Sequence, residues 1–228
     1  MVDDWELYAR NVAVALKKAG FMRVCTALPN DATQQEIDLL ESTIATATDE
    51  KPLQQLLKDH PALLAQEYNS SCRWIKDQVR LGNQYVPDFM ACRLDSTGVK
   101  WTLVELQSPT ERLFNTKDRP GEHLAEGLAQ INSWRTWLTD NVSYARDQLG
   151  LIGIDARDAV GLILVGRSSS ITEHDRTLLR GYAVPGLSVH SYDWLVRDAR
   201  KRKQNAQSWI SQGNSASCEE CDLIRDYL

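Results

Sequence analysis

The sequence predicts a mixed α/β fold of the α+β kind, in which helices flank a mixed central sheet and a helical extension comes first. Three patterns support this prediction. Apolar residues recur at helical spacing up to about residue 60, short strand-like segments follow, and helix and strand patterns then alternate. The chain of 228 residues is long enough to bury a core without disulfide bonds.

The first two predicted helices lie before residue 48. Residues 3–19 place Trp5, Tyr8, Val12 and Leu16 at helical spacing, with acidic residues at the front and lysines at the back, as the helix dipole favours. A second helix is expected to start near Asp31, whose side chain can cap it, and to run to about residue 47.

A short amphipathic helix is predicted within 49–61, DEKPLQQLLKDHP. Pro52 falls in its first turn, where proline is tolerated, and Pro61 ends it. Glu50 lies at its front, where an acid complements the helix dipole or assists a site elsewhere.

Three successive strands are predicted next, as an antiparallel meander. They are RWIKDQVRL at 73–81, YVPDFMACRL at 85–94 and KWTLVELQ at 100–107, and DSTG at 95–98 supplies turn residues between the last two. Four further elements are predicted after the meander: a helix over 121–139, a buried strand over 159–165, a helix around 171–183 and a strand in GLSVHSY at 186–192. Asp193 is expected to cap the helix that ends the fold.

The pattern divides the chain into an N-terminal helical extension at 1–47, a main domain at 48–212 and a loose tail at 213–228. Cys218 and Cys221 form one CxxC in that tail, which lacks the second ligand pair of a structural zinc site.

Composition and charge bear on the location of the protein and on what it can bind. The five cysteines lack a disulfide-framework spacing and the first ten residues do not read as a signal peptide, so we expect a cytoplasmic protein. No apolar run is long enough to span a membrane. The net charge of -5 does not attract polyanions, so contact with nucleic acid would need local basic patches. The cations between Arg197 and Lys203 form such a patch or merely complement the helix dipole.

Two acids in the predicted hairpin are the main candidate site. If the turn is centred between Ser96 and Thr97, Asp88 lies opposite Glu105, and Gln107 shares their face. Opposed carboxylates repel each other unless they are solvated or a cation lies between them. Mg²⁺ needs only one or two protein carboxylates, and the carbonyl of Leu106 offers a further ligand.

The order of these motifs resembles the PD-(D/E)XK nuclease superfamily, and more closely the Shedu anti-phage defence nucleases. The resemblance covers roughly 48–203 and includes PLQQLLKDHP, VPDF, VELQSP, the helix that carries Gln130, VGR at 165–167 and YDWL at 192–195. It implies a restriction-endonuclease-like fold, DNA as substrate, Mg²⁺ or Mn²⁺ as cofactor, and a homo-oligomer such as a tetramer.

The resemblance also implies roles for the site residues. Asp88 and Glu105, with Leu106, would hold the metal, Gln107 would orient water or phosphate, and Glu50 and Gln130 would assist. Gln107 stands where the superfamily usually has lysine, and a neutral amide cannot supply the positive charge of an ammonium.

Three functions therefore remain open on the sequence. The first is a metal-dependent DNA endonuclease or nickase, and the second is a nuclease-like fold that binds nucleic acid or a partner protein without cleaving it. The third is an assembly scaffold. Simpler interpretations also exist for the single residues, because acids on an edge hairpin are often solvated and Glu126 with Gln130 can form a solvated helix stripe.

Overall fold

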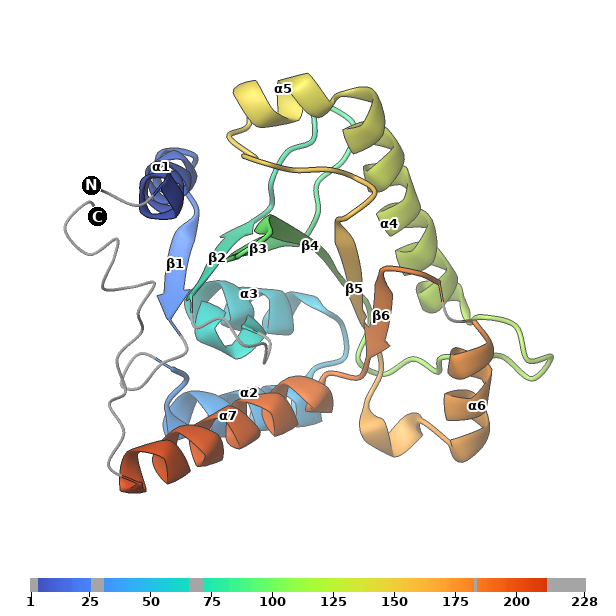
Figure 1. Ribbon diagram of the computed structural model, residues 1–228. Helices are drawn as coiled ribbons and strands as arrows, with labels where there is room; N and C mark the ends of the chain where they lie inside the picture. Colours follow the sequence, from blue (N-terminus) through green and yellow to red (C-terminus); the bar gives the residue numbers. More distant parts are fainter. Residues whose placement is uncertain (1–3, 26–30, 66–71, 183, 213–228) are drawn as a thin grey trace.

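A six-stranded mixed sheet with helices on both faces makes up the molecule (Figure 1). This computed structural model describes residues 4–25, 31–65, 72–182 and 184–212. Strands β1 to β4 are antiparallel neighbours, and β5 and β6 continue the sheet in parallel with β4. The predicted fold class is confirmed, and this arrangement is consistent with a restriction-endonuclease-like core.

The described residues form six strands and seven α-helices. The strands are β1 (Met22–Cys25), β2 (Cys72–Asp77), β3 (Phe89–Asp95), β4 (Gly98–Leu106), β5 (Val160–Leu164) and β6 (Leu187–His190). The helices are α1 (Asp4–Lys18), α2 (Gln34–Thr46), α3 (Lys51–Asp59), α4 (Glu122–Asp140), α5 (Val142–Asp147), α6 (Glu173–Gly181) and α7 (Asp193–Ser211), with 3-10 turns η1 (Pro61–Leu64) and η2 (Ser168–Ser170).

The sheet separates two apolar cores. One face is covered by α1 and α4, which bury residues such as Leu16 and Ile131 against Trp101 and Leu103 of β4. The other face is covered by α2, α3 and α7, seen below the sheet in Figure 1. Helical spacing of leucines explains α3, whose Leu53, Leu56 and Leu57 all face this second core.

The hairpin of β3 and β4 has the predicted register. Met90 pairs with Leu103 and Cys92 with Trp101, around a turn at Ser96 and Thr97. Because side chains alternate along both strands, the two acids lie on one face, at the end of the hairpin where β3 begins and β4 ends.

The cap of α2 differs from the prediction. Thr33, and not Asp31, occupies the cap, where its hydroxyl accepts from the Glu36 N–H and the Glu36 carboxylate accepts from the Thr33 N–H. Asp31 is instead buried against Arg202 of α7.

The predicted cap of α7 is also wrong. Asp193 is the first residue of that helix, and its carboxylate accepts a hydrogen bond from the Ser168 N–H at 2.6 Å. It therefore ties the start of α7 to η2, the turn that follows β5.

Strand β1 and helix α5 were not predicted. β1 pairs with β2 at the edge of the sheet, and α1 packs into the same core as α4. The described residues before position 48 thus take part in the sheet and its cores, while the proposed domain limits stay a prediction.

Two further predictions concern membrane-spanning helices and the C-terminal tail. Among the described residues, no helix combines the length and apolar character needed to cross a membrane. The tail from residue 213, with Cys218 and Cys221, lies outside the described residues.

Candidate functional site

The two predicted acids meet at one end of the hairpin. Asp88 directly precedes β3, Glu105 is the last residue but one of β4, and their carboxyl groups are within hydrogen-bonding reach of each other. One Asp88 oxygen accepts the Leu106 N–H at 2.8 Å. Glu105 is 5% exposed and Asp88 is half-buried, so the two carboxyl groups are poorly solvated.

Burial changes the acidity of both groups. It raises the pKa of Glu105 to about 9, with the charge of Asp88 as the next cause. It also raises the pKa of Asp88 to about 6, although the hydrogen bond from Leu106 acts in the opposite direction. The pair therefore holds a proton to higher pH than an isolated carboxyl group would, because two adjacent carboxylates cannot both stay charged in a poorly solvated place.

Gln107 lies beside the pair, as the sequence predicted. Its amide N–H donates to Glu105 at 2.8 Å, and its amide oxygen lies 3.1 Å from Nδ1 of His123. His123 was not among the predicted site residues. Nδ1 of the same imidazole also lies 3.6 Å from Glu126, and its Nε2 lies 3.9 Å from Glu111, so carboxylates flank it.

Helix α4 brings Gln130 to the site. Its amide contacts the Glu105 carboxyl group and donates to it when the amide nitrogen faces Glu105, as the surrounding groups require. The close approach of α4 depends on Gly127, where an added methyl group would lie 3.1 Å from Ile163 and 3.4 Å from Gln107. Close packing against these neighbours therefore explains why a glycine occurs in the middle of α4.

Helix α3 contributes a residue that the sequence analysis missed. Gln54 donates its amide N–H to the second oxygen of Asp88 at 2.6 Å. Glu50, one turn earlier, is half-buried at the cap of α3, makes no capping hydrogen bond and adds negative charge to the field at Asp88 and Glu105. Residues four apart on a helix share a face, so the spacing of Glu50 and Gln54 is the sequence signal that could have identified Gln54.

Backbone geometry also turns Leu106 toward the acids. The N–H and C=O of one strand residue point to the same side, and the Leu106 N–H points to Asp88, so its carbonyl faces that side too. From the opposite side, the fully buried Tyr192 donates its hydroxyl to the Gln107 carbonyl at 2.8 Å. Burial raises the pKa of Tyr192 well above its usual value, which keeps this donor protonated.

The donor set fits a hard divalent cation. Mg²⁺ and Mn²⁺ prefer oxygen ligands, and Mg²⁺ is commonly held by one or two carboxylates with waters in the remaining positions. The described part of the chain offers no cluster of three or more histidine, cysteine or acidic side chains for a metal, so the pair of acids with a carbonyl is the relevant arrangement. A cation between the two carboxylates would offset their repulsion in place of a proton.

Three basic residues of α7 make contacts within the chain, one of them buried and two at the surface. Arg202 is buried between Asp31 and Asp198, Arg200 pairs with Glu41 at 2.6 Å, and Arg197 donates to the Ser168 hydroxyl at 2.9 Å. Of the two interpretations of this helix, these contacts favour a structural role over a phosphate-binding patch.

Arg167, which follows β5, braces the segment before α3. It donates to the Ala47 carbonyl at 2.6 Å. This bond fixes the chain three residues before Glu50.

Comparison with known proteins gives one family. Residues 47–196 match the family described as Shedu protein SduA, C-terminal. No curated protein matches the chain significantly. The matched range begins just before α3 and ends in the first turn of α7, so it contains every residue of the acid site.

Proposed function

Since the chain belongs to the Shedu SduA C-terminal family, which suggests a part in anti-phage defence, we propose that it is a metal-dependent DNA endonuclease or nickase of the cytoplasm. The proposal includes Mg²⁺ or Mn²⁺ as cofactor, DNA as substrate and a homo-oligomer as the working form. It assigns the hydrolysis of phosphodiester bonds to the acid site.

One observation carries this proposal. The buried Glu105 and the half-buried Asp88 lie side by side, with pKa values raised by burial and, for Glu105, by its neighbour. Burial of an acid pair lowers the stability of the fold. Strongly perturbed carboxyl groups cluster at functional sites, so a function is a reason for the pair to be kept there.

Each residue of the site has a role in the proposal. Asp88 and Glu105 would bind the cation, and Gln54 would hold the Asp88 carboxylate in the ligating orientation through its 2.6 Å hydrogen bond. Gln107 would orient the attacking water or a phosphate oxygen with its amide. Leu106 would offer its carbonyl to the same cation, while Glu50 and Gln130 would assist from the two helices.

The bound cation would supply two things, a lower pKa for a water molecule and neutralisation of the charge that develops on the phosphodiester. The protein then has to keep that water in line with the scissile bond. The network from His123 through Gln107 to Glu105 limits the orientations open to the Gln107 amide.

A second function is supported by the identity of residue 107. A neutral glutamine, already hydrogen-bonded to Glu105 and His123, cannot stabilise developing negative charge as a lysine would. The alternative is therefore a nuclease-like module that binds nucleic acid or a partner protein without cleaving it.

Supercoiled plasmid separates the two functions. With Mg²⁺ or Mn²⁺ the proposal expects nicked or linear product, and it expects at least a hundredfold slower cleavage in Asp88→Asn and Glu105→Gln, which keep the shape of each side chain. Glu122→Gln, an exposed acid in the first turn of α4, is the matched control and should cleave normally. A shifted but intact plasmid with either metal would favour the binding module.

A further inference from the structure

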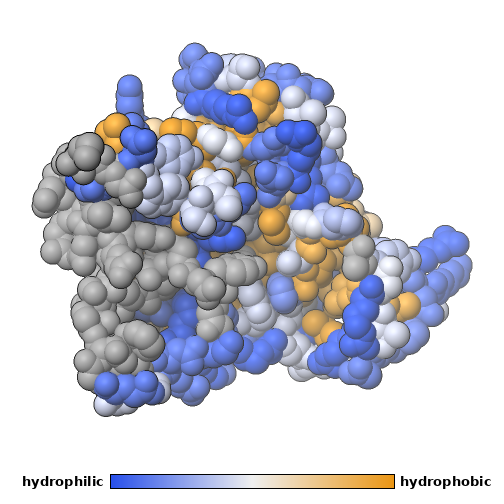
Figure 2. Space-filling model, viewed as in Figure 1, coloured by the Kyte–Doolittle hydropathy of each residue, from blue (hydrophilic) through white to orange (hydrophobic). Residues whose placement is uncertain are grey.

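A groove with basic walls lies between α1 and α5, beside the end of β2. Its volume is about 680 Å³. The residues that line it all belong to the described part of the chain, and the charged ones are four cations and one acid, Lys18, Lys76, Arg80, Arg146 and Asp147. Figure 1 shows the segment after β2 running toward α5, with α1 beside it, and hydrophilic residues gather over α5 at the top of Figure 2.

Ion pairs do not offset the cations of this groove. Within the described ranges none of the four forms a salt bridge. Lys76 donates to the Ala19 carbonyl at 2.6 Å. Arg146 donates twice to the Ile154 carbonyl, at 2.6 and 3.0 Å. Both acceptors are neutral, so these two side chains are fixed in place and keep their positive charge.

The acids next to the groove are engaged by other cations. Asp77 of β2 pairs with Lys58 at 2.8 Å. Asp155, which lies near Arg146, pairs with Arg157 at 2.6 Å. The chain has a net charge of -5, yet the groove carries a local excess of positive charge, which attracts a polyanion.

Helix dipoles explain only some of these cations. Lys18 and Arg146 lie in the last turns of α1 and α5, where a positive charge complements the dipole. Arg80 is exposed and belongs to the segment after β2, outside any helix. The convergence of cations from separate segments on one hollow therefore needs a further reason.

The groove adjoins the acid site. Gln78, which lines the groove, donates its N–H to the Asp88 carbonyl at 2.9 Å. Lys76 pairs with Met90, two residues after Asp88. Each strand of duplex DNA carries a phosphate about every 3.4 Å. A DNA strand that reaches the acid pair therefore has several phosphates within reach of the groove.

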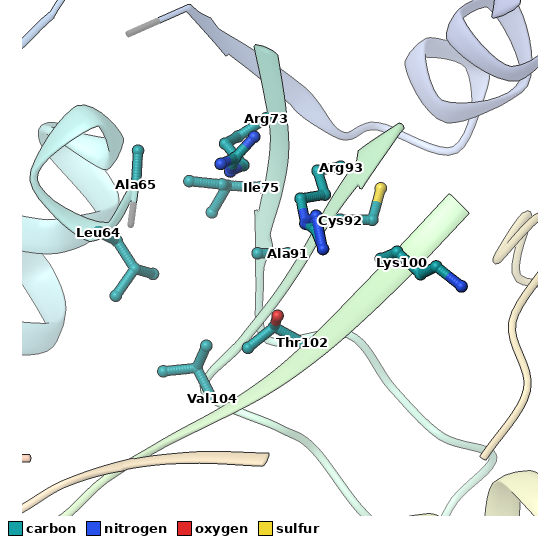
Figure 3. A pocket seen from close by; sticks show the side chains of 10 residues that line it. All are labelled: Leu64, Ala65, Arg73, Ile75, Ala91, Cys92, Arg93, Lys100, Thr102 and Val104. Atoms are coloured by element: carbon teal, nitrogen blue, oxygen red, sulfur yellow. The ribbon is translucent and has the colours of Figure 1, made fainter. Parts of the chain in front are cut away.

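A smaller hollow on the other face of the sheet is a poorer candidate. It also has cations in its lining, but its Arg93 pairs with Asp95 at 3.3 Å (Figure 3). It encloses about 30 Å³, room for about two water molecules. A run of phosphates does not fit in that space.

We propose that the groove between α1 and α5 binds the phosphate backbone of DNA, through Lys18, Lys76, Arg80 and Arg146. The inference rests on the proposed DNA substrate and adds the surface that holds it. Phosphate contacts position a duplex without reading its sequence, so the groove contributes affinity and not base preference. Lys18 lies outside the family match at 47–196, so α1 takes part in DNA binding.

The salt dependence of DNA binding tests this surface. The fluorescence anisotropy of a short labelled duplex is measured in EDTA, so that binding is observed without metal-dependent cleavage. Lys18→Gln and Arg80→Gln should each bind more weakly and lower the slope of log affinity against log salt by about 1, because each removes one phosphate contact. Two unrelated duplex sequences should show the same loss.

Two variants serve as controls for the loss of charge. Arg176→Gln, an exposed arginine of α6, matches Arg80→Gln, and Lys203→Gln of α7 matches Lys18→Gln. Both should bind DNA like the unaltered protein. An unchanged slope in either groove variant, an equal loss in Lys203→Gln, or no DNA binding by the folded protein at low salt would each overturn the inference.

The groove and the nuclease function can fail separately. DNA that binds through the groove but stays intact with Mg²⁺ and Mn²⁺ would remove the nuclease function and leave the groove. Nicking by a protein whose groove variants bind DNA normally would remove the groove alone.

Discussion

Asp88 and Glu105 are held together by the fold although their charges repel. Asp88 is fixed by Leu106 and Gln54, and Glu105 by Gln107 and Gln130. These hydrogen bonds prevent the two carboxyl groups from turning apart, so a proton or a cation has to occupy the space between their charges.

The acid pair makes stability depend on pH. For Glu105 the pKa is 4.5 ordinarily and about 9 in the folded protein, and for Asp88 it is 3.8 ordinarily and about 6. Between those values the folded protein keeps protons that the unfolded chain has released, so raising the pH favours unfolding. In EDTA, the free energy of unfolding measured with urea should therefore fall as the pH rises through this window.

Saturating Mg²⁺ should remove most of this fall, because the ion takes over the role of the proton. Glu105→Gln should show a flatter profile in EDTA and little response to Mg²⁺. A wild-type profile that is flat, or that rises between the two pKa values of Glu105, would contradict the assignment.

Gln54 should act as a positioning residue for the metal ligand Asp88. Gln54→Ala removes the 2.6 Å hydrogen bond to Asp88, and loss of such a supporting contact typically weakens metal binding about 10–100-fold. The concentration of free Mn²⁺, measured by electron paramagnetic resonance, gives the affinity.

The neighbouring residue provides a matched control for this substitution. Gln55 donates to Asp59 within α3 at 2.9 Å, so Gln55→Ala should leave the Mn²⁺ affinity unchanged. If both variants bind Mn²⁺ as tightly as the unaltered protein, Gln54 has no part in positioning Asp88.

Helices α2 and α7 depend on one buried ion pair. Arg202 of α7 lies 3.2 Å from Asp31, with 5% and 1% of the two side chains exposed, and it also contacts Asp198. Asp31→Ala should cost about 3 kcal/mol, near the lower end for a broken buried pair because Asp198 remains. Thr33→Ala, which removes the helix cap, should cost only about 0.5–2 kcal/mol. Urea unfolding compares the two variants, and an equal cost would argue against the structural role of Asp31.

Elements with a strong period were predictable, and those without one were not. Four spaced apolar residues indicated α1, and alternation around a two-residue turn gave the register of β3 and β4. β1 has only the four residues MRVC, and α5 has six, too few to show a period. Asp31 and Thr33 are both good caps, and their different roles depend on Arg202, which is 171 positions from Asp31.

At the scale of the whole molecule, the sequence predicted only the part of the candidate site that lies within the hairpin. The predicted hairpin register placed Asp88, Glu105 and Gln107 on one face, and the structure places them side by side. Gln54 reaches the site from α3 and Tyr192 from the residue before α7, both distant in sequence from the hairpin, and no periodicity encodes such contacts. Family resemblance supplied Gln130 and the positions around it, which physical patterns alone left as a solvated helix face.

The proposed function requires one cation between Asp88 and Glu105, and calorimetric titration of the full chain with Mn²⁺ measures whether it binds there. We predict one ion bound per chain, and no detectable binding in Asp88→Asn or Glu105→Gln that remain folded by circular dichroism. Folded wild-type protein that binds no Mn²⁺, or variants that bind it as tightly as the wild type, would show that this acid pair is not a metal site.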